Sequence, residues 1–263
     1  PEHTFFGIVL FFFSWILLLI YDYKPPIKIF FLVLLNILSI FILAKSSMVI
    51  VFLLVSVFFF FIGNIKQKVN PLKILIIPIV LFITLYAFLH IFPGTRFASL
   101  ITIAEQGGGG LFGKLSEVIH SDASINDRVL NVVFPYYGIV INKGIPGGLH
   151  GFYDLSLILF EHFNGYFWSG FGSNKILSFI GAFIYELGLV GVIFILYMYW
   201  FLKDNSNPNR FFELILLFTV LNSGIAVAFS LVPVLIAIMY YKKSNSTLNS
   251  QNYDSSPNLN IYQ

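Results

Sequence analysis

The chain has 263 residues, of which 58% are hydrophobic and 10% are charged, and its mean hydropathy is +0.87. This composition argues against an ordinary water-soluble domain, since water cannot solvate so much apolar surface. The lack of cysteine excludes disulfides, thiolate metal sites and cysteine nucleophiles, and a formal net charge of only +3 argues against nucleic-acid binding.

Long unbroken apolar runs predict an all-α, polytopic integral membrane protein with about five to seven transmembrane helices, because about 20 apolar residues cross a bilayer. In a first membrane part, residues 1–92, the runs cover 5–21, 27–44, 47–63 and 74–92. In a second part, residues 176–243, they cover 176–202 and 211–241. Asn222-Ser223-Gly224 interrupts the last run, which we interpret as a hairpin; the alternative is one tilted helix. Because the first run begins almost directly after Pro1, we expect an N-terminal portion to be missing.

The lysines and arginines of the short loops predict an orientation, because cytoplasmic loops carry an excess of these residues. They recur on alternate sides of the apolar runs, which makes their three loops cytoplasmic. Residues 93–175 then form one large extracytoplasmic loop. The tail 244–263, rich in Asn and Ser, is predicted to be disordered and cytoplasmic.

The large loop is rich in aromatic and cationic side chains, and we expect it to carry the function. Arg128 precedes the glycine-rich segment 144–148 and suits a pyrophosphate, because a guanidinium makes bidentate hydrogen bonds to phosphate oxygens. Arg96, just after the fourth run, and Lys143 are further cations. The alternatives are a local ion pair for Arg128 and an interfacial, snorkelling side chain for Arg96.

Candidate proton acceptors of the loop are Glu161, His162 and His150, since a carboxylate or imidazole can take a hydroxyl proton near neutral pH. The alternative for each is a solvated surface side chain. Glu186 lies inside an apolar run, where it is a candidate for a buried polar contact, and Glu213, close to Arg210, is expected at the membrane interface. No two histidines have zinc-binding spacing, so we predict no metal site.

Four different sequence features follow one another along the chain. The opening Glu2-His3-Thr4-Phe5-Phe6-Gly7 precedes a run, and Ala44-Lys45-Ser46-Ser47 forms a tight turn. Arg96 and Gly107 are separated by ten residues in the large loop. Tyr185-Glu186-Leu187-Gly188 then lies where the chain re-enters its last runs. Together these features resemble the O-antigen polymerase family, whose members join lipid-linked oligosaccharide repeat units in the bacterial inner membrane and have more spans than this chain.

The resemblance implies a multi-pass enzyme of that membrane. It would transfer a growing O-antigen, capsular or exopolysaccharide glycan from undecaprenyl pyrophosphate to a sugar hydroxyl of the next lipid-linked unit. It implies no cofactor, metal or nucleotide sugar. The implied partners are lipid-linked oligosaccharides, membrane lipid, a chain-length regulator and other assembly proteins, with no nucleic acid.

The resemblance also implies roles for individual residues. The leaving pyrophosphate would be stabilised by Arg128 and Arg96. The acceptor proton would go to a carboxylate or histidine, with Glu161, His162, Glu2 and His150 as candidates. Substrate binding would involve Lys45, Lys143, His150, Glu2 and Glu186.

Two other functions stay open. An O-antigen ligase, which delivers glycan to lipid A core, usually carries a histidine before the re-entering span, and His162 lies fourteen residues before Ile176. A flippase or other transporter would line its spans with polar residues, whereas these runs are almost entirely apolar.

Overall fold

The computed structural model describes residues 2–44, 46–65, 86, 96–106, 110–207, 209–223, 225 and 229–254. All regular elements within these ranges are helical, in agreement with an all-α chain. They are α1 (Glu2–Ile20), α2 (Ile27–Ser39), the π-helix η1 (Ile40–Ala44), α3 (Ser47–Ile65), α5 (Arg96–Gln106), α6 (Gly110–Ser121), α7 (Ala123–Ile141), α8 (Phe152–His162), the 3-10 helix η2 (Trp168–Gly170), α9 (Phe179–Leu187), α10 (Leu189–Leu202), α11 (Arg210–Asn222) and α12 (Leu231–Asp254).

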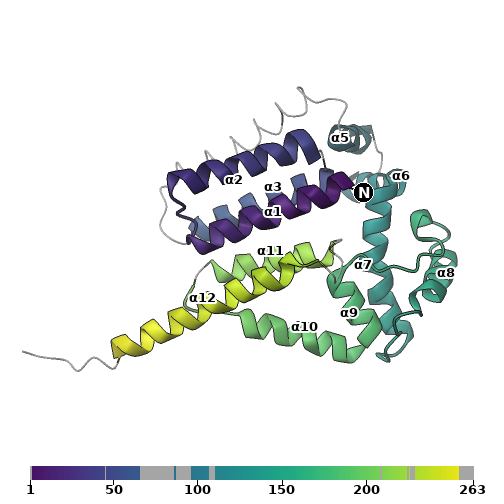
Figure 1. Ribbon diagram of the computed structural model, residues 1–263. Helices are drawn as coiled ribbons and strands as arrows, with labels where there is room; N and C mark the ends of the chain where they lie inside the picture. Colours follow the sequence, from purple (N-terminus) through teal and green to yellow (C-terminus); the bar gives the residue numbers. More distant parts are fainter. Residues whose placement is uncertain are drawn as a thin grey trace, which may run out of the picture.

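The first helices form one end of the molecule (Figure 1). α1 packs on α2, α3 and α12, and it buries Phe12 and Leu19. Asp22 and Tyr23, with φ of 50° and 59°, adopt the left-handed conformation that ends α1, and the Tyr23 N–H donates to the Leu18 carbonyl at 2.8 Å. The chain therefore reverses into α2 within a few residues.

The last two apolar runs each form two helices. In the first, Gly188, with a φ of 59°, separates α9 from α10. In the second, α11 ends at Asn222 and α12 begins at Leu231. The Arg210 Nη2 donates to the Met239 carbonyl at 3.1 Å, so the start of α11 lies beside the third turn of α12 and the chain doubles back.

The segment between the apolar parts is a layer of helices at the other end of the molecule, where α7 packs on α6, α8, α9 and η2 (Figure 1). Asp122 caps α7 by accepting the N–H groups of Ser124 and Ile125. Asn126, fully buried, donates to the carbonyls of Ile119 and Tyr166 and accepts from Ser169. These bonds tie the start of α7 to the chain around η2.

The two ends have separate buried apolar clusters. The larger cluster joins α1, α3, α9, α10, α11 and α12, and the smaller one joins α7, α8 and the chain near η2. α9 contributes to both, since Ile180 and Ile184 lie in the larger cluster and Tyr185 in the smaller. It is therefore the link between the two ends.

The prediction of membrane spans is wrong for the described residues: none of their helices combines the length and the apolar character needed to cross a bilayer. The runs 176–202 and 211–241 are divided as described above, and the run 27–44 changes from α-helix to π-helix at Ile40. The same finding contradicts the prediction that the chain is a multi-pass protein of a bacterial inner membrane. The run 74–92 lies outside the described residues except for Tyr86.

Candidate functional site

The glycine-rich segment after α7 lies directly against the end of α9. The Gly147 N–H donates to the Tyr185 carbonyl at 2.8 Å, and the Gly148 N–H donates to the Glu186 carbonyl at 3.3 Å. The Leu189 N–H, at the start of α10, donates to the Gly144 carbonyl at 2.9 Å. We call residues 142–151 with residues 185–189 the glycine junction. Two segments that are distant from each other in the sequence thus form one site.

The close approach at the junction requires glycine on both sides. A Cβ added to Gly147 would lie 2.3 Å from the Tyr185 ring, and one added to Gly188 would lie 2.3 Å from the Gly144 carbonyl oxygen. Such distances are far inside van der Waals contact, so a side chain would force the segments apart. Gly188 also holds a positive φ, which ends α9 there.

Three predicted substrate-binding residues belong to the two segments of the glycine junction. Lys143 and His150 are exposed in the loop, and Glu186 is half-buried in the last turn of α9. Burial raises the pKa of the Glu186 carboxyl above its usual value. A carboxyl with a raised pKa can exchange a proton closer to neutral pH, as a general base or acid must. The junction therefore combines a cation, an imidazole and a candidate base.

Arg128 lies near the other end of α7. Its Nε donates to the Ser124 Oγ at 3.2 Å, and its charge lowers the pKa of Asp127, which burial raises more strongly. Lys143 follows Arg128 by fifteen positions, which is about 20 Å along a helix. Arg128 therefore lies outside the glycine junction.

Glu161 and His162 end α8, and both are exposed. The His162 Nε2 lies 3.1 Å from the Tyr137 hydroxyl, and the two rings are in contact. Tyr137 follows Arg128 by nine residues, a spacing that places them on opposite faces of α7, about 14 Å apart along its axis. The structure thus does not bring His162 to the bond that Arg128 would serve.

The remaining predicted residues are described only in part. Arg96 begins α5 and Glu2 begins α1. Lys45 lies outside the described residues, between η1 and Ser46.

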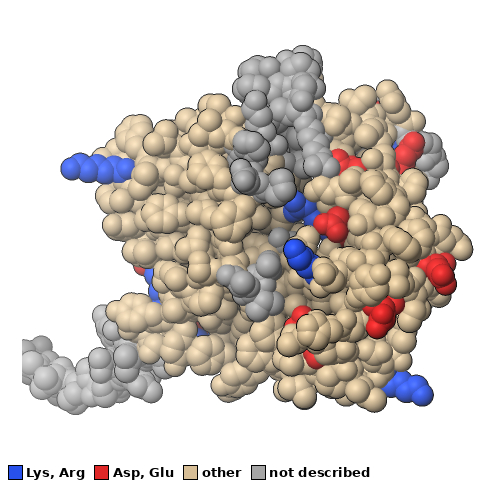
Figure 2. Space-filling model, turned by 45° about the vertical axis from the view of Figure 1, so that its right-hand side comes forward, with Lys and Arg blue, Asp and Glu red and all other residues tan. Residues whose placement is uncertain are grey.

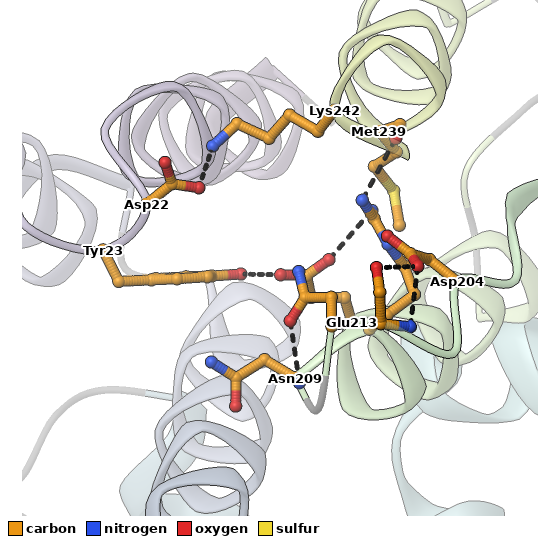
Figure 3. Close-up of polar contacts among 10 residues, drawn as sticks. Asp22, Tyr23, Asp204, Asn209, Glu213, Met239 and Lys242 are labelled. Carbon is orange, nitrogen blue, oxygen red and sulfur yellow. Dashed lines mark hydrogen bonds and ion pairs between the residues drawn. The ribbon is translucent and has the colours of Figure 1, made fainter. Parts of the chain in front are cut away.

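A buried ion pair within α11 is linked to the α1–α2 turn by a hydrogen bond, and the sequence did not predict it (Figure 3). Arg210 and Glu213 are 1% and 5% exposed, and the Arg210 Nη1 lies 2.9 Å from the Glu213 Oε2. These two atoms are close but not aligned as a hydrogen bond. The Tyr23 hydroxyl, 190 residues earlier, donates to the Glu213 Oε1 at 2.9 Å.

Burial has the largest effect on the pKa values of this cluster. It raises the pKa of Glu213, against the opposing effects of Arg210, the Tyr23 hydrogen bond and Lys242. Burial and the nearby Glu213 raise the pKa of Tyr23 well above its usual value. The i, i+3 spacing of Arg210 and Glu213 was a signal of the pair, but a location at a membrane interface was the wrong interpretation, since both side chains are buried.

An apolar pocket of about 400 Å³ lies beside the ion pair, between α1, α2, α3 and α11. Tyr23, Asn209 and Glu213 are polar residues of its wall. Most of the remaining wall is apolar, including Phe11, Trp15, Leu18, Val33, Leu53 and Phe212.

The exposed charges are distributed unevenly. On the face shown in Figure 2, acidic side chains lie mostly over the right-hand half, and most of the left-hand half is uncharged. Among the described residues, no group of three or more His, Asp or Glu side chains could hold a metal ion.

No family model, no curated protein and no solved structure matches this chain. The site is therefore defined by its own geometry: a glycine junction with ionisable groups at one end of the molecule, and a buried ion pair beside an apolar pocket at the other.

Proposed function

We propose that this protein is a glycosyltransferase that extends a lipid-linked glycan. The donor would be a glycan on undecaprenyl pyrophosphate, and the acceptor a sugar hydroxyl of a second lipid-linked repeat unit. The observation that carries the proposal is the glycine junction, because it unites Lys143, His150 and Glu186 from two segments that resemble the O-antigen polymerases.

The reaction needs a base and a stabilised leaving group. The acceptor oxygen forms a bond to the anomeric carbon of the donor as the bond from that carbon to the pyrophosphate oxygen breaks. The electron pair leaves with the pyrophosphate, whose charge Lys143 balances. Glu186 takes the proton of the acceptor hydroxyl. Its half-buried position suits this role, since the raised pKa makes its carboxylate a stronger base.

Arg128 has a separate task in this scheme. A repeat unit is an oligosaccharide, so its reacting hydroxyl lies several sugars from its own pyrophosphate. A distance of about 20 Å along α7 between Arg128 and the junction fits an acceptor held at both ends. Arg128 therefore binds the acceptor pyrophosphate, and Lys143 binds the donor pyrophosphate.

The test uses the purified full chain with synthetic undecaprenyl-pyrophosphate-linked repeat units, and gel electrophoresis detects longer glycans. Glu186→Gln should slow extension by about 10²–10⁴-fold, the usual contribution of a general base. Lys143→Ala and Arg128→Ala should each slow it by about 10²-fold. The matched controls are Glu117→Gln on α6 and Lys203→Ala after α10, both exposed and away from the junction.

The pH profile separates a base from a structural residue. The rate of the wild type should rise with pH through a value above 4.5, the usual pKa of glutamate, and Glu186→Gln should lose this rise. A wild type that forms no longer glycan rules out the polymerase. Full activity of Glu186→Gln rules out this base. If glycan is transferred only to added lipid A core, the protein is a ligase.

A further inference from the structure

The apolar pocket beside the Arg210–Glu213 pair is not used by the proposed glycan transfer. Its wall is polar at one end and mostly apolar along the rest. Tyr23 and Pro25, from the α1–α2 turn, and Asn209 and Glu213, from the start of α11, lie at one end. From there the wall follows α1 back to Phe11, α2 forward to Ile37 and α3 back to Leu53. This shape suits one extended apolar chain with a polar group at one end.

The polar end offers a carboxylate oxygen that the described residues do not saturate. The Glu213 Oε2 is buried against Arg210, whose Nη1 lies 2.9 Å away, and the Glu213 Oε1 accepts from the Tyr23 hydroxyl. A carboxylate oxygen can accept two hydrogen bonds, so a donor from a ligand beside Tyr23 would find an acceptor at Oε1. The Ser14 hydroxyl, further along the wall, is buried without a partner among the described residues.

The charge of the ion pair decides which polar group fits. Arg210 and Glu213 are both buried, and their charges balance. An ammonium group beside the Glu213 carboxylate would leave one uncompensated positive charge, and a carboxylate or phosphate would leave one negative charge. A hydroxyl donates a hydrogen bond and adds no charge. The ligand therefore carries a neutral hydroxyl.

We propose that this pocket binds a long-chain alcohol, with its alkyl chain between α1, α2 and α3 and its hydroxyl donating a hydrogen bond to Glu213. A volume of about 400 Å³ accommodates a single chain. Binding should tighten about fourfold for each added methylene until the chain fills the pocket. The inference does not rest on the glycan transfer, and its test contains no glycan.

Trp15 provides the readout, since it lines the pocket and is 5% exposed. Trp168→Phe and Trp200→Phe, both at exposed positions, leave Trp15 as the reporter. Dodecanol tagged with bromine at its chain end should quench Trp15 fluorescence, and untagged dodecanol should reverse the quenching. Dodecanoate, dodecylamine and dodecyl phosphate, with the same chain, should compete at least tenfold more weakly than dodecanol.

Two pairs of variants locate the ligand. Val33→Phe fills the pocket and should abolish quenching, whereas Leu34→Phe, the neighbouring exposed position on α2, should not change it. Glu213→Gln leaves the Arg210 charge unbalanced, so dodecanoate should then compete better than dodecanol. Ser14→Ala should keep the preference for the alcohol, because Ser14 lies away from the polar end.

Three outcomes would overturn the inference. The first is no quenching of Trp15 in a wild type whose circular dichroism shows a folded helical protein. The second is equal competition by the charged and neutral chains, which would remove the argument from the ion pair. The third is equal loss of quenching in Val33→Phe and Leu34→Phe, which would place the ligand elsewhere.

Discussion

The Arg210–Glu213 pair shows how burial changes the behaviour of single residues. At a surface, a pair three residues apart on a helix contributes little to stability. Here both groups have lost their water, and the Arg210 Nε and Nη1 have no hydrogen-bond acceptor among the described residues. Each charge therefore depends on the other, so the effect of a substitution depends on whether one charge or both are removed.

Arg210→Met should lower the free energy of unfolding by about 3–5 kcal/mol, because it leaves the Glu213 carboxylate buried without its cation. The double variant Arg210→Met, Glu213→Met should recover wild-type stability or exceed it, as apolar replacements of buried pairs often do. Chemical denaturation measures both. The control is Lys242→Met, which removes the cation of the ion pair with the exposed Asp22 and should cost less than about 1 kcal/mol. Equal losses in the single and double variants would contradict this prediction.

The pH dependence of stability should report on Glu213. Because its pKa is raised in the folded chain, the native state keeps a proton that the unfolded state has lost. Its contribution is complete below the usual value of 4.5 and is lost as pH rises through the raised pKa. The neighbouring charges are already part of this shift, since Arg210 and Lys242 lower the pKa of Glu213 and Asp22 raises it.

The measurement compares melting temperatures of the wild type and Glu213→Gln from about pH 4 to about pH 8. The wild type should lose stability relative to the variant as pH increases, since Gln carries no proton that titrates. Parallel curves for the two proteins would show that Glu213 keeps an ordinary pKa.

At the scale of elements, glycine determines where helices end and how closely they approach. Gly188 separates α9 from α10, and its neighbour across the junction is the backbone of Gly144. Gly148 has a similar positive φ of 74°, but a Cβ there would meet nothing within 4 Å. A substitution of Gly148 therefore tests backbone strain alone, and a substitution of Gly188 tests backbone strain together with steric contact.

Gly148→Ala should cost about 1–3 kcal/mol, the range for a non-glycine residue in a rarely populated backbone conformation. Gly188→Ala should cost clearly more, because its Cβ would also lie 2.3 Å from the Gly144 carbonyl oxygen. Unfolding in urea gives both values. If both substitutions cost the same, steric contact does not hold the junction together.

For the whole molecule, two buried clusters joined through α9 suggest two units of different local stability. Leu217 belongs to the larger cluster and Leu159 to the smaller, and both are fully buried. They form a matched pair, because the same side chain is deleted from each cluster.

Leu159→Ala and Leu217→Ala should each cost about 2–5 kcal/mol at their own cluster. Hydrogen exchange should accelerate in α7 and α8 for Leu159→Ala, and in α1 and α11 for Leu217→Ala. Mass spectrometry of peptides resolves these regions. Uniform acceleration in both variants would mean that the described helices open as one unit.

Much of the secondary structure follows from the sequence alone. The apolar runs predicted helices, and α1, α2 with η1, and α3 lie within them to a few residues. Local patterns suffice for this, because periodicity and backbone propensity act over neighbouring residues. The prediction that these runs span a membrane was wrong for the described residues, and the break at Gly188 depends on where the chain packs.

The sites were decided by the tertiary structure. The sequence singled out Lys143, His150 and Glu186 one by one, but only the fold brings residues 142–151 against the end of α9. The sequence also places Arg210 and Glu213 three residues apart. That they form a buried pair, and that Tyr23 completes the cluster across 190 residues, was decided by the tertiary structure. Burial is set by distant neighbours, and burial determines which charges must be paired and which pKa values move.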